Sequence, residues 1–330
     1  MINYVRKITA FLLAVITLFT LFGCEKSNVV ETSNIDFCVN FIDVGQGDSI
    51  FIKLPDGKTM LIDTGYADFA QNNLNAICDN INDFSAGKID FLILTHPDND
   101  HIGNAVKIIE RYQIGRCYLP FIAEEKRQYF PVLESANSLL KARNVETVFS
   151  DNYKYIKGDR YQITFLSPLP SGVEDSSYDK LNASNFPEDY LVNDISPIIY
   201  ANICGVKFMF TGDASVSQEK LVVKNFRSGV YNSIFSRYGI EVDIKRIDYL
   251  KVAHHGAQDC SGIEFISEIY PSNAVISCGG GNNYGHPSTP VLETLITVNP
   301  DCNIFRTDIY GTISVQGVGE NVNVVLQSEN

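Results

Sequence analysis

The sequence predicts a single domain of mixed α/β (α+β) class over residues 35–330. Short apolar runs recur along this stretch, and such runs are typical of strands that are buried in a sheet. Segments with helical periodicity lie between several of these runs. No stretch with the composition of a linker interrupts the pattern, and 330 residues with 45% apolar content are enough to bury one large core.

Most predicted strands end at a glycine turn or at a side chain that can bind a metal ion. Asp56-Gly57 is typical of a hairpin turn, and Ser288 is predicted to be the N-cap of the last helix. Two segments lack strand or helix periodicity, and we predict a long loop at 168–192 and a polar insertion at 227–245. The predicted strands are residues 35–44, 49–54, 59–62, 91–94, 116–120, 145–149, 153–156, 161–167, 196–203, 207–211, 249–253, 273–277, 304–306, 312–315 and 322–326. The predicted helices are residues 67–81, 105–112, 124–143, 215–226 and 288–298.

The first 23 residues predict an export signal. Arg6 and Lys7 precede an apolar run at 8–22, which is too short to favour a stable membrane span. The run ends in Leu-Phe-Gly-Cys24, which resembles the lipobox of bacterial lipoproteins and implies cleavage before Cys24 and lipid on its thiol. We therefore expect an extracytoplasmic protein that is lipid-anchored to the cell membrane, with 24–34 as a tether. An uncleaved N-terminal anchor is the alternative, and it would leave the domain on the same side of the membrane.

The chain is acidic. Its net charge is −13, and removal of residues 1–23 takes away two basic and no acidic residues, which changes the net charge to −15. This balance argues against a broad face for duplex nucleic acid, which needs many Lys and Arg contacts. It is compatible with phosphate chemistry at a site where metal ions supply the positive charge.

The cysteine pattern does not predict a structural zinc site. The eight cysteines include Cys24 and form no CxxC pair, and the seven others are an odd number, so at least one of them is expected to be unpaired. Disulfide connectivity cannot be derived from the sequence.

One short segment carries four side chains that can bind metal ions. His96, Asp98, Asp100 and His101 follow a predicted buried strand at 91–94, on a loop that leads into a predicted helix. All five histidines of the chain lie in short Gly-, Asp- or Asn-rich stretches at the ends of apolar runs. Because neutral imidazole is the commonest metal ligand, we interpret these stretches as parts of one site. A solvated polar turn is the alternative, and it accounts for the Asp and Asn residues but not for the histidines. The five are His96, His101, His254, His255 and His286.

The order of motifs carries a family resemblance. FIDVGQGDSI, LIDTG, THPDNDHIGN, NDIS, FTGD, KVAHHG and YGHP occur in the order seen in the extracytoplasmic hydrolase domain of ComEC DNA-uptake proteins. That domain belongs to the metallo-β-lactamase superfamily, and the resemblance extends over about residues 35–315. It implies an αββα sandwich with a two-metal site at one edge.

The resemblance also implies roles for individual residues. It implies two divalent ions, Zn²⁺ or Mn²⁺, about 3.5–4 Å apart, that hold a bridging hydroxide as the nucleophile. Asp63 resembles the carboxylate that orients a ligand histidine, and Asp48 is expected in a similar supporting place, with capping of the glycine turn as the alternative. His255 is an alternative to His254 as a ligand, because the tandem pair leaves the choice open. The implied ligands are His96 and Asp98 for one metal, Asp100, His101 and His254 for the second, and Asp213 bridging both.

The chain departs from the superfamily pattern in two places. Asp98 stands where the β-lactamases carry a histidine, which disfavours β-lactam cleavage. The histidine that is usual between the second and fourth motifs has no counterpart, and the NDIS segment (residues 193–196) occupies its place. One metal is therefore expected to be short of a ligand. The predicted catalytic residues are Asp100, His255 and Lys251, with Lys251 facing the pocket or lying on the surface, and the predicted substrate-binding residues are Asn193, Ser196, Asn283, Tyr284 and His286.

Together these features predict a surface-anchored, metal-dependent hydrolase of phosphoester bonds. The substrate is either a nucleic acid or a phosphate-containing cell-wall polymer, and a resemblance to surface phosphorylcholine esterases of the same superfamily supports the second. The alternatives are a carboxyl-ester, lactone or β-lactam hydrolase and a non-catalytic binding lipoprotein. No protein partner is evident from the sequence, and we expect a monomer. The substrate, the choice between Zn²⁺ and Mn²⁺ and the occupancy of both metal sites stay open at this point.

Overall fold

The computed structural model describes residues 35–85, 87–122, 124–150, 153–168 and 192–328. The segment Ile35–Asn330 forms one compact unit. Cys24 with its tether, and nearly all of the predicted loop at 168–192, lie outside the described residues. Within the described ranges, no helix is long and apolar enough to cross a membrane.

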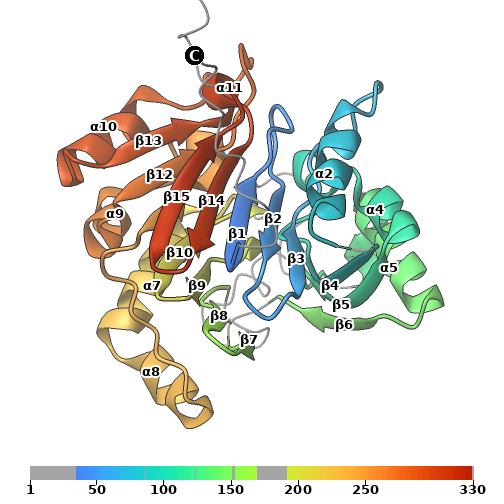
Figure 1. Ribbon diagram of the computed structural model, residues 1–330, viewed down its shortest axis with the longest axis horizontal. Coiled ribbons are helices and arrows are strands. Elements are labelled where there is room, and N and C mark those ends of the chain that lie inside the picture. The colour runs from blue at the N-terminus through green and yellow to red at the C-terminus, as the bar shows by residue number, and fades with distance from the viewer. Residues whose placement is uncertain (1–34, 86, 123, 151–152, 169–191, 329–330) are drawn as a thin grey trace, which may run out of the picture. The chain divides into compact units, whose positions relative to one another are not determined.

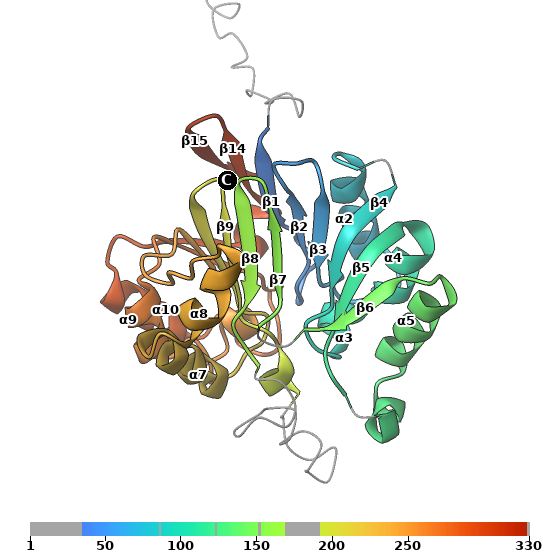
Figure 2. The same ribbon diagram turned by 90° about the horizontal axis from the view of Figure 1, so that it is seen from below.

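The described strands form two mixed sheets that face each other (Figures 1 and 2). The eight-stranded sheet has the order β15-β14-β1-β2-β3-β4-β5-β6, and the seven-stranded sheet has the order β13-β12-β11-β10-β9-β8-β7. The strands of the first sheet are β1 (Phe37–Phe41), β2 (Ile50–Lys53), β3 (Thr59–Ile62), β4 (Lys88–Ile93), β5 (Gln113–Leu119), β6 (Glu146–Phe149), β14 (Ile313–Val318) and β15 (Asn321–Leu326). Those of the second are β7 (Tyr155–Gly158), β8 (Tyr161–Phe165), β9 (Ile199–Ile203), β10 (Val206–Phe210), β11 (Tyr249–Lys251), β12 (Asn273–Ile276) and β13 (Asn303–Arg306).

The main core lies between the two sheets. Phe37 of β1 contacts Phe208 of β10 with ring centroids 6.1 Å apart, and Phe41 contacts Phe210 at 6.2 Å. These rings belong to a buried cluster drawn from strands of both sheets. Burial of large aromatic side chains from both inner faces supplies much of the hydrophobic stabilisation of such a sandwich.

Helices cover the outer faces of both sheets (Figure 2). On the first sheet these are α2 (Asn72–Asn82), α4 (Ala105–Arg111) and α5 (Pro131–Ala142). On the second they are α7 (Val216–Arg227), α8 (Val230–Phe235), α9 (Ile263–Ile269) and α10 (Thr289–Val298), whose apolar sides form a second buried cluster with β10, β11 and β12. The short elements are α3 (Asn99–Ile102), α11 (Thr307–Tyr310) and the 3-10 turns Glu124–Tyr129, Asn193–Ile195, Ser236–Tyr238 and Ala253–Gly256. The layers are therefore helix, sheet, sheet and helix, which is the predicted αββα sandwich.

Two predicted helices begin later than expected. Helix α2 starts at Asn72 instead of residue 67, because the Asp68 carboxylate accepts hydrogen bonds from the backbone N–H groups of Asn72 and Asn73 and so caps the helix from outside it. Helix α5 starts at Pro131, since proline has the backbone angle of a first helical residue and no N–H to leave unpaired. The residues before it, Glu124–Tyr129, form a 3-10 turn.

The prediction of a polar insertion at 227–245 is wrong. This segment contains α8, and its side chains Tyr231, Phe235 and Ile240 are buried in the cluster between the second sheet and its helices. Helix α8 has only six residues, and a helix of this length gives little periodic signal in the sequence. Helix α9 was likewise absent from the prediction, since seven residues give little periodic signal.

Candidate metal centre

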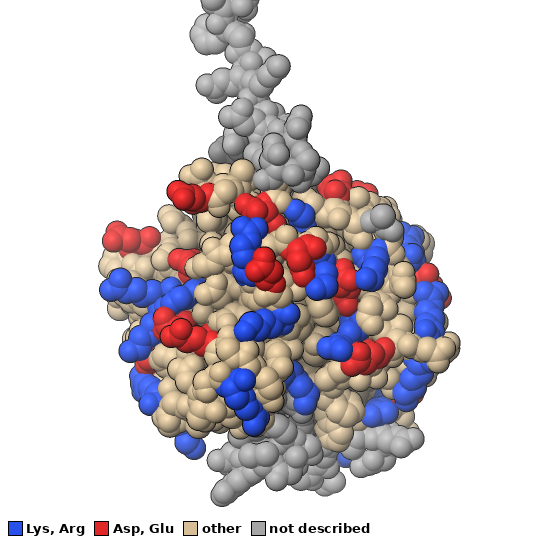
Figure 3. All heavy atoms as spheres, turned by 60° about the horizontal axis from the view of Figure 1, so that its bottom comes forward, with Lys and Arg blue, Asp and Glu red and all other residues tan. Residues whose placement is uncertain are grey.

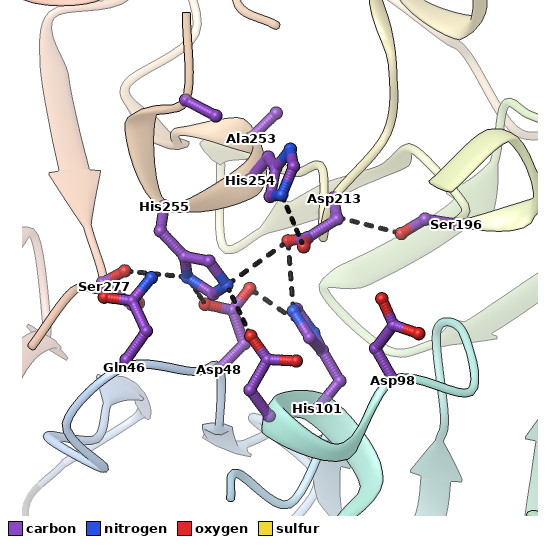
Figure 4. Close-up of polar contacts among 12 residues, drawn as sticks. Gln46, Asp48, Asp98, His101, Ser196, Asp213, Ala253, His254, His255 and Ser277 are labelled. Carbon is purple, nitrogen blue, oxygen red and sulfur yellow. Dashed lines mark hydrogen bonds and ion pairs between the residues drawn. The ribbon is translucent and has the colours of Figure 1, made fainter. Parts of the chain in front are cut away.

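The site forms where parallel strands of both sheets end. β3 pairs in parallel with β4, and β10, β11 and β12 pair in parallel with one another. Polar residues follow these strands closely: Asp63 comes immediately after β3, and His96, Asp213 and His254 come three residues after the ends of β4, β10 and β11. The fold brings Asp213, His254 and His255 of the second sheet beside Asp98 and His101, which follow β4 of the first sheet (Figure 4).

Asp213 lies at the centre of this cluster. Its Oδ1 atom is 3.1 Å from Nε2 of His101 and 3.7 Å from Nε2 of His255. Its Oδ2 atom is 3.7 Å from Nε2 of His96 and also 3.7 Å from Nε2 of His254. The backbone N–H of Asp213 donates to Ser196 Oγ at 3.0 Å, which holds the residue in place. One buried carboxylate thus faces four imidazole nitrogens.

Three of these imidazoles have their other ring nitrogen tied to an oxygen. His101 Nδ1 lies 2.8 Å from Asp63 Oδ2, and His255 Nδ1 lies 2.9 Å from the backbone oxygen of Ser277. His96 Nδ1 lies 3.0 Å from the hydroxyl of Thr95, which itself donates to Asp63 at 2.7 Å. Since these oxygens accept, each Nδ1 carries a proton, and each Nε2 has a lone pair available to a cation when its ring is neutral.

No described residue donates a hydrogen bond to these Nε2 lone pairs. Among the described residues, the buried Nε2 atoms of His96, His101 and His255 and the Oδ1 atom of Asp213 have no hydrogen-bond partner. Burying several unpaired acceptors together costs free energy, and a cation placed among them removes that cost. Imidazole nitrogens with carboxylate oxygens are a ligand set that suits divalent zinc, iron or manganese. Among the described residues, Asp48, His101, Asp213 and His255 form one group whose ligand atoms all lie within 4.8 Å of one another.

The two aspartates of the THPDNDH motif approach different imidazoles. Asp98 Oδ2 lies 3.6 Å from His96 Nε2, and Asp100 Oδ2 lies 3.3 Å from His255 Nε2. The Asp100 backbone also packs against the glycine turn, where Gly47 has φ of +147° and a Cβ would lie 2.3 Å from the Asp100 carbonyl oxygen. Only glycine permits this close approach, so the geometry of the site requires Gly47 of the GQGD motif.

The electrostatics of the cluster favour positive charge within it. Burial disfavours the charged ring of His255, but the carboxylates of Asp213, Asp100 and Asp48 outweigh burial and raise its pKa to about 9. Burial likewise opposes ionisation of Asp213, but the nearby rings of His101 and His255 hold its pKa well below the usual value. The same field that favours a protonated imidazole attracts a metal cation.

Lys251 is neither on the surface nor facing an open pocket. It is fully buried, and its ammonium lies 2.7 Å from Asp48 Oδ2 and donates to the backbone oxygen of Val252. Asp48 Oδ1 in turn lies 3.4 Å from His255 Nδ1. The predicted catalytic role of Lys251 is therefore corrected: its charge is paired with Asp48, and it acts on the site by holding that carboxylate behind His255.

The NDIS segment supports the site from behind. Ser196 is fully buried and its hydroxyl oxygen accepts the Asp213 N–H, so its predicted contact with substrate is wrong. Asp194 accepts hydrogen bonds from the hydroxyls of Ser215 and Ser217 at the start of α7. Asn193 is also buried, with an Oδ1 atom that has no hydrogen-bond partner among the described residues, and its role stays a prediction.

The glycine-rich loop after β12 lies beside the tandem histidines. Asn282 holds it: its Oδ1 accepts from the N–H groups of Tyr284 and His286, and its Nδ2 donates to Gly279 O and His286 O. The His286 ring is 5.7 Å from that of His254, and Tyr284, 72% exposed, stacks on His286 at 5.7 Å. The loop thus carries an exposed ring next to the cluster. Asn283 is exposed, and the substrate-binding roles of Asn283, Tyr284 and His286 stay predictions.

Two contributing carboxylates were absent from the sequence prediction. Asp259 lies 3.5 Å from His254 Nδ1. Glu219 of α7 is buried and accepts the N–H groups of Ser261 and Gly262, and burial raises its pKa to about 8. Glu219 thereby fixes the end of the segment that carries Asp259. The sequence contains one signal that could have identified Glu219, which is its position as an acidic residue on the apolar side of a predicted helix.

Comparisons with known proteins agree with this architecture. Residues 42–184 match the family model described as the metallo-beta-lactamase superfamily. These residues belong to the metallo-β-lactamase superfamily. The predicted family resemblance and the predicted fold class are therefore confirmed, and the chain has the fold of the metal-dependent hydrolases of this superfamily.

Curated relatives match over most of this chain. It is 30% identical to ComE operon protein 3 of Bacillus subtilis over 292 residues, which are 83% of this chain and 32% of that protein. It is 23% identical to competence protein ComA of Neisseria gonorrhoeae over 272 residues, 82% of this chain and 31% of that protein. The chain therefore spans about a third of the length of these relatives.

A solved metallo-beta-lactamase fold protein, YhfI from Bacillus subtilis, aligns with a TM-score of 0.48 and 11% identity. The alignment covers 86% of this chain and all of that one.

Proposed function

We propose that this protein is a two-metal hydrolase of phosphoester bonds. The observation that carries the proposal is the single carboxylate of Asp213 facing four imidazole Nε2 atoms, three of them with their Nδ1 protons held by fixed oxygens. Divalent ions held by these residues would supply Lewis-acid chemistry, since they would lower the pKa of a bound water and offset negative charge on phosphoryl oxygens.

The residues of the chain hold this centre in place. Asp63 orients His101 directly and His96 through Thr95, while Ser277 and Asp48 orient His255. Asp98 and Asp100 face the cluster from one turn, with side chains 45% and 33% exposed, and so form the side of the site open to a substrate. A preorganised cluster of this kind keeps its geometry without reorganising during the reaction.

Two features favour a phosphoester over a β-lactam. Asp98 stands where the β-lactamases have a histidine and adds a negative charge to the site. This charge favours the binding of metal ions, which can also bind an anionic phosphate. The net charge of −13 does not favour binding of a long duplex, although Lys and Arg side chains are numerous among the Asp and Glu side chains on the face in Figure 3. A small or partly shielded phosphoester, from a nucleic acid or a cell-wall polymer, fits best. The resemblance of the sequence motifs to DNA-uptake proteins supports the nucleic-acid variant.

We also propose that the protein acts outside the cytoplasmic membrane, anchored by lipid on Cys24. The basic residues, apolar run and lipobox-like end of residues 1–24 support this. We also propose that the anchored hydrolase is a monomer, in which no second subunit covers the active-site edge.

The function is tested by comparing substrates on the same metal-loaded protein. We expect hydrolysis of bis-p-nitrophenyl phosphate that disappears after chelation and returns when Zn²⁺ or Mn²⁺ is supplied separately. Nitrocefin and a simple lactone are the comparison substrates. Faster cleavage of either would favour the carboxyl-ester or lactam alternative, and a chain that retains no metal after reconstitution would favour the binding module.

Tyr284→Ala is expected to raise the KM for bis-p-nitrophenyl phosphate by roughly 5-fold or more and to leave kcat within about twofold. The exposed ring can stack on an aromatic group of the substrate, an interaction worth about 1–3 kcal/mol, without touching the cluster. Tyr238→Ala, an exposed tyrosine of another segment, is the matched control and should leave both constants unchanged. An unchanged KM in Tyr284→Ala would remove this residue from the substrate site.

A further inference from the structure

We propose that the tandem histidines bind different metal ions, so that His254 supplies the ligand that the first metal otherwise lacks. The inference rests on the proposed two-metal function. It differs from the expectation that either His254 or His255 completes the second site while the other is not a ligand.

The two oxygens of Asp213 divide the imidazoles into two pairs. Oδ1 faces His101 and His255, and Oδ2 faces His96 and His254. The aspartates of the THPDNDH motif follow the same division, since Asp100 approaches His255 and Asp98 approaches His96. The result is two balanced groups that share Asp213. One consists of His96, Asp98 and His254, and the other of Asp100, His101 and His255.

The backbone is shaped to turn both neighbouring side chains inward. His254 and His255 have φ of 48° and 55°, in the left-handed region, and Gly256 follows with φ of 83°. Left-handed backbone is unfavourable for a non-glycine residue, so two such residues in succession persist only where other interactions hold them. Here the turn places both Nε2 atoms 3.7 Å from the Asp213 carboxylate, with the two rings at 64° to each other.

His254 also has the supporting contact of a metal ligand. Its Nδ1 lies 3.5 Å from Oδ1 of Asp259, an exposed carboxylate, which is a longer contact than the 2.8 Å between His101 Nδ1 and the buried Asp63. This contact favours a proton on Nδ1 and leaves Nε2, the atom near Asp213, with its lone pair. His286 differs, because its Nδ1 lies 3.4 Å from the amide of Gln46 rather than beside a carboxylate.

Two side chains of the segment that replaces the usual histidine, those of Ser196 and Asp194, are engaged elsewhere. The Ser196 hydroxyl accepts the Asp213 N–H, and the Asp194 carboxylate binds the hydroxyls at the start of α7. His254 therefore approaches the group of His96 and Asp98 from the opposite sheet, where it can complete that site.

Metal binding by single and double variants of the full chain tests the division. We expect wild type to bind two Mn²⁺ or Zn²⁺ ions per chain by elemental analysis, and His254→Ala to bind one ion tightly and the other at least about 10-fold more weakly. His254→Ala combined with Asp98→Ala should still keep one ion, because both changes damage the same site. His254→Ala combined with Asp100→Ala should lose both ions.

The controls separate this inference from the proposed activity. His286→Ala removes a neighbouring imidazole and should keep two ions, and circular dichroism verifies that each variant is folded. Wild-type affinity for two ions in His254→Ala, or loss of both ions in the His254→Ala/Asp98→Ala variant, would overturn the division. Two bound ions without phosphoester hydrolysis would overturn the proposed function and leave the division standing, whereas fewer than two ions in wild type would overturn both.

Discussion

Asp213→Ala is expected to lower kcat/KM for bis-p-nitrophenyl phosphate by at least about 10³-fold and to reduce the bound metal to one ion per chain or fewer. Asp213 is the carboxylate that both groups of imidazoles share, with Oδ1 toward His101 and His255 and Oδ2 toward the other two. Its removal takes a ligand from both metals, and a loss of about 4 kcal/mol in transition-state stabilisation corresponds to that change in rate.

The control for Asp213→Ala is Asp79→Ala, an exposed aspartate on α2 that loses the same charge far from the cluster in sequence and fold. It should keep wild-type activity and metal content. Steady-state kinetics and elemental analysis on the same preparations decide the outcome. An Asp213→Ala protein that retains two ions and more than about a tenth of the activity would show that this carboxylate does not bridge two metals.

Lys251→Met is expected to lower the free energy of unfolding by about 3–5 kcal/mol. Lys251 is fully buried, and its Nζ is 2.7 Å from the equally buried Asp48. Burial opposes ionisation of Asp48, but the charges of Lys251 and of the nearby His255 ring outweigh burial and hold the pKa of Asp48 below its usual value. Removing the lysine leaves a buried carboxylate without its principal counter-charge, which is costly in protein interiors.

Urea unfolding monitored by circular dichroism measures this loss. The double variant Lys251→Met/Asp48→Asn removes both charges and should recover a substantial part of it, because replacing a whole buried pair costs less than breaking it. If the single variant unfolds within about 1 kcal/mol of wild type, or if the double variant is the less stable of the two, the pair does not stabilise the site in this way.

Much of the fold and the site could be predicted because their signals are local. The THPDNDH segment places metal-binding side chains immediately after an apolar strand, and Asp63, Asp213 and His254 follow other strands in the same manner. Since the carboxyl ends of parallel strands meet at one edge of a sheet, ligands at those positions converge without any knowledge of the contacts. The motif order then predicted the αββα sandwich. Helices α8 and α9 were not predicted because segments of six and seven residues are too short to show a helical period clearly.

What the sequence determined by itself was which segments meet: the order of strands, the turn residues and the acidic and imidazole side chains at their ends. Only the tertiary structure decided which atoms of those residues face one another. It paired Lys251 with Asp48, turned the Ser196 hydroxyl to the Asp213 backbone, and directed His254 and His255 to different oxygens of one carboxylate. These contacts form between side chains of two different sheets that meet at one edge of the molecule. The neighbours of a residue in the sequence do not indicate which side chain of the other sheet it will contact.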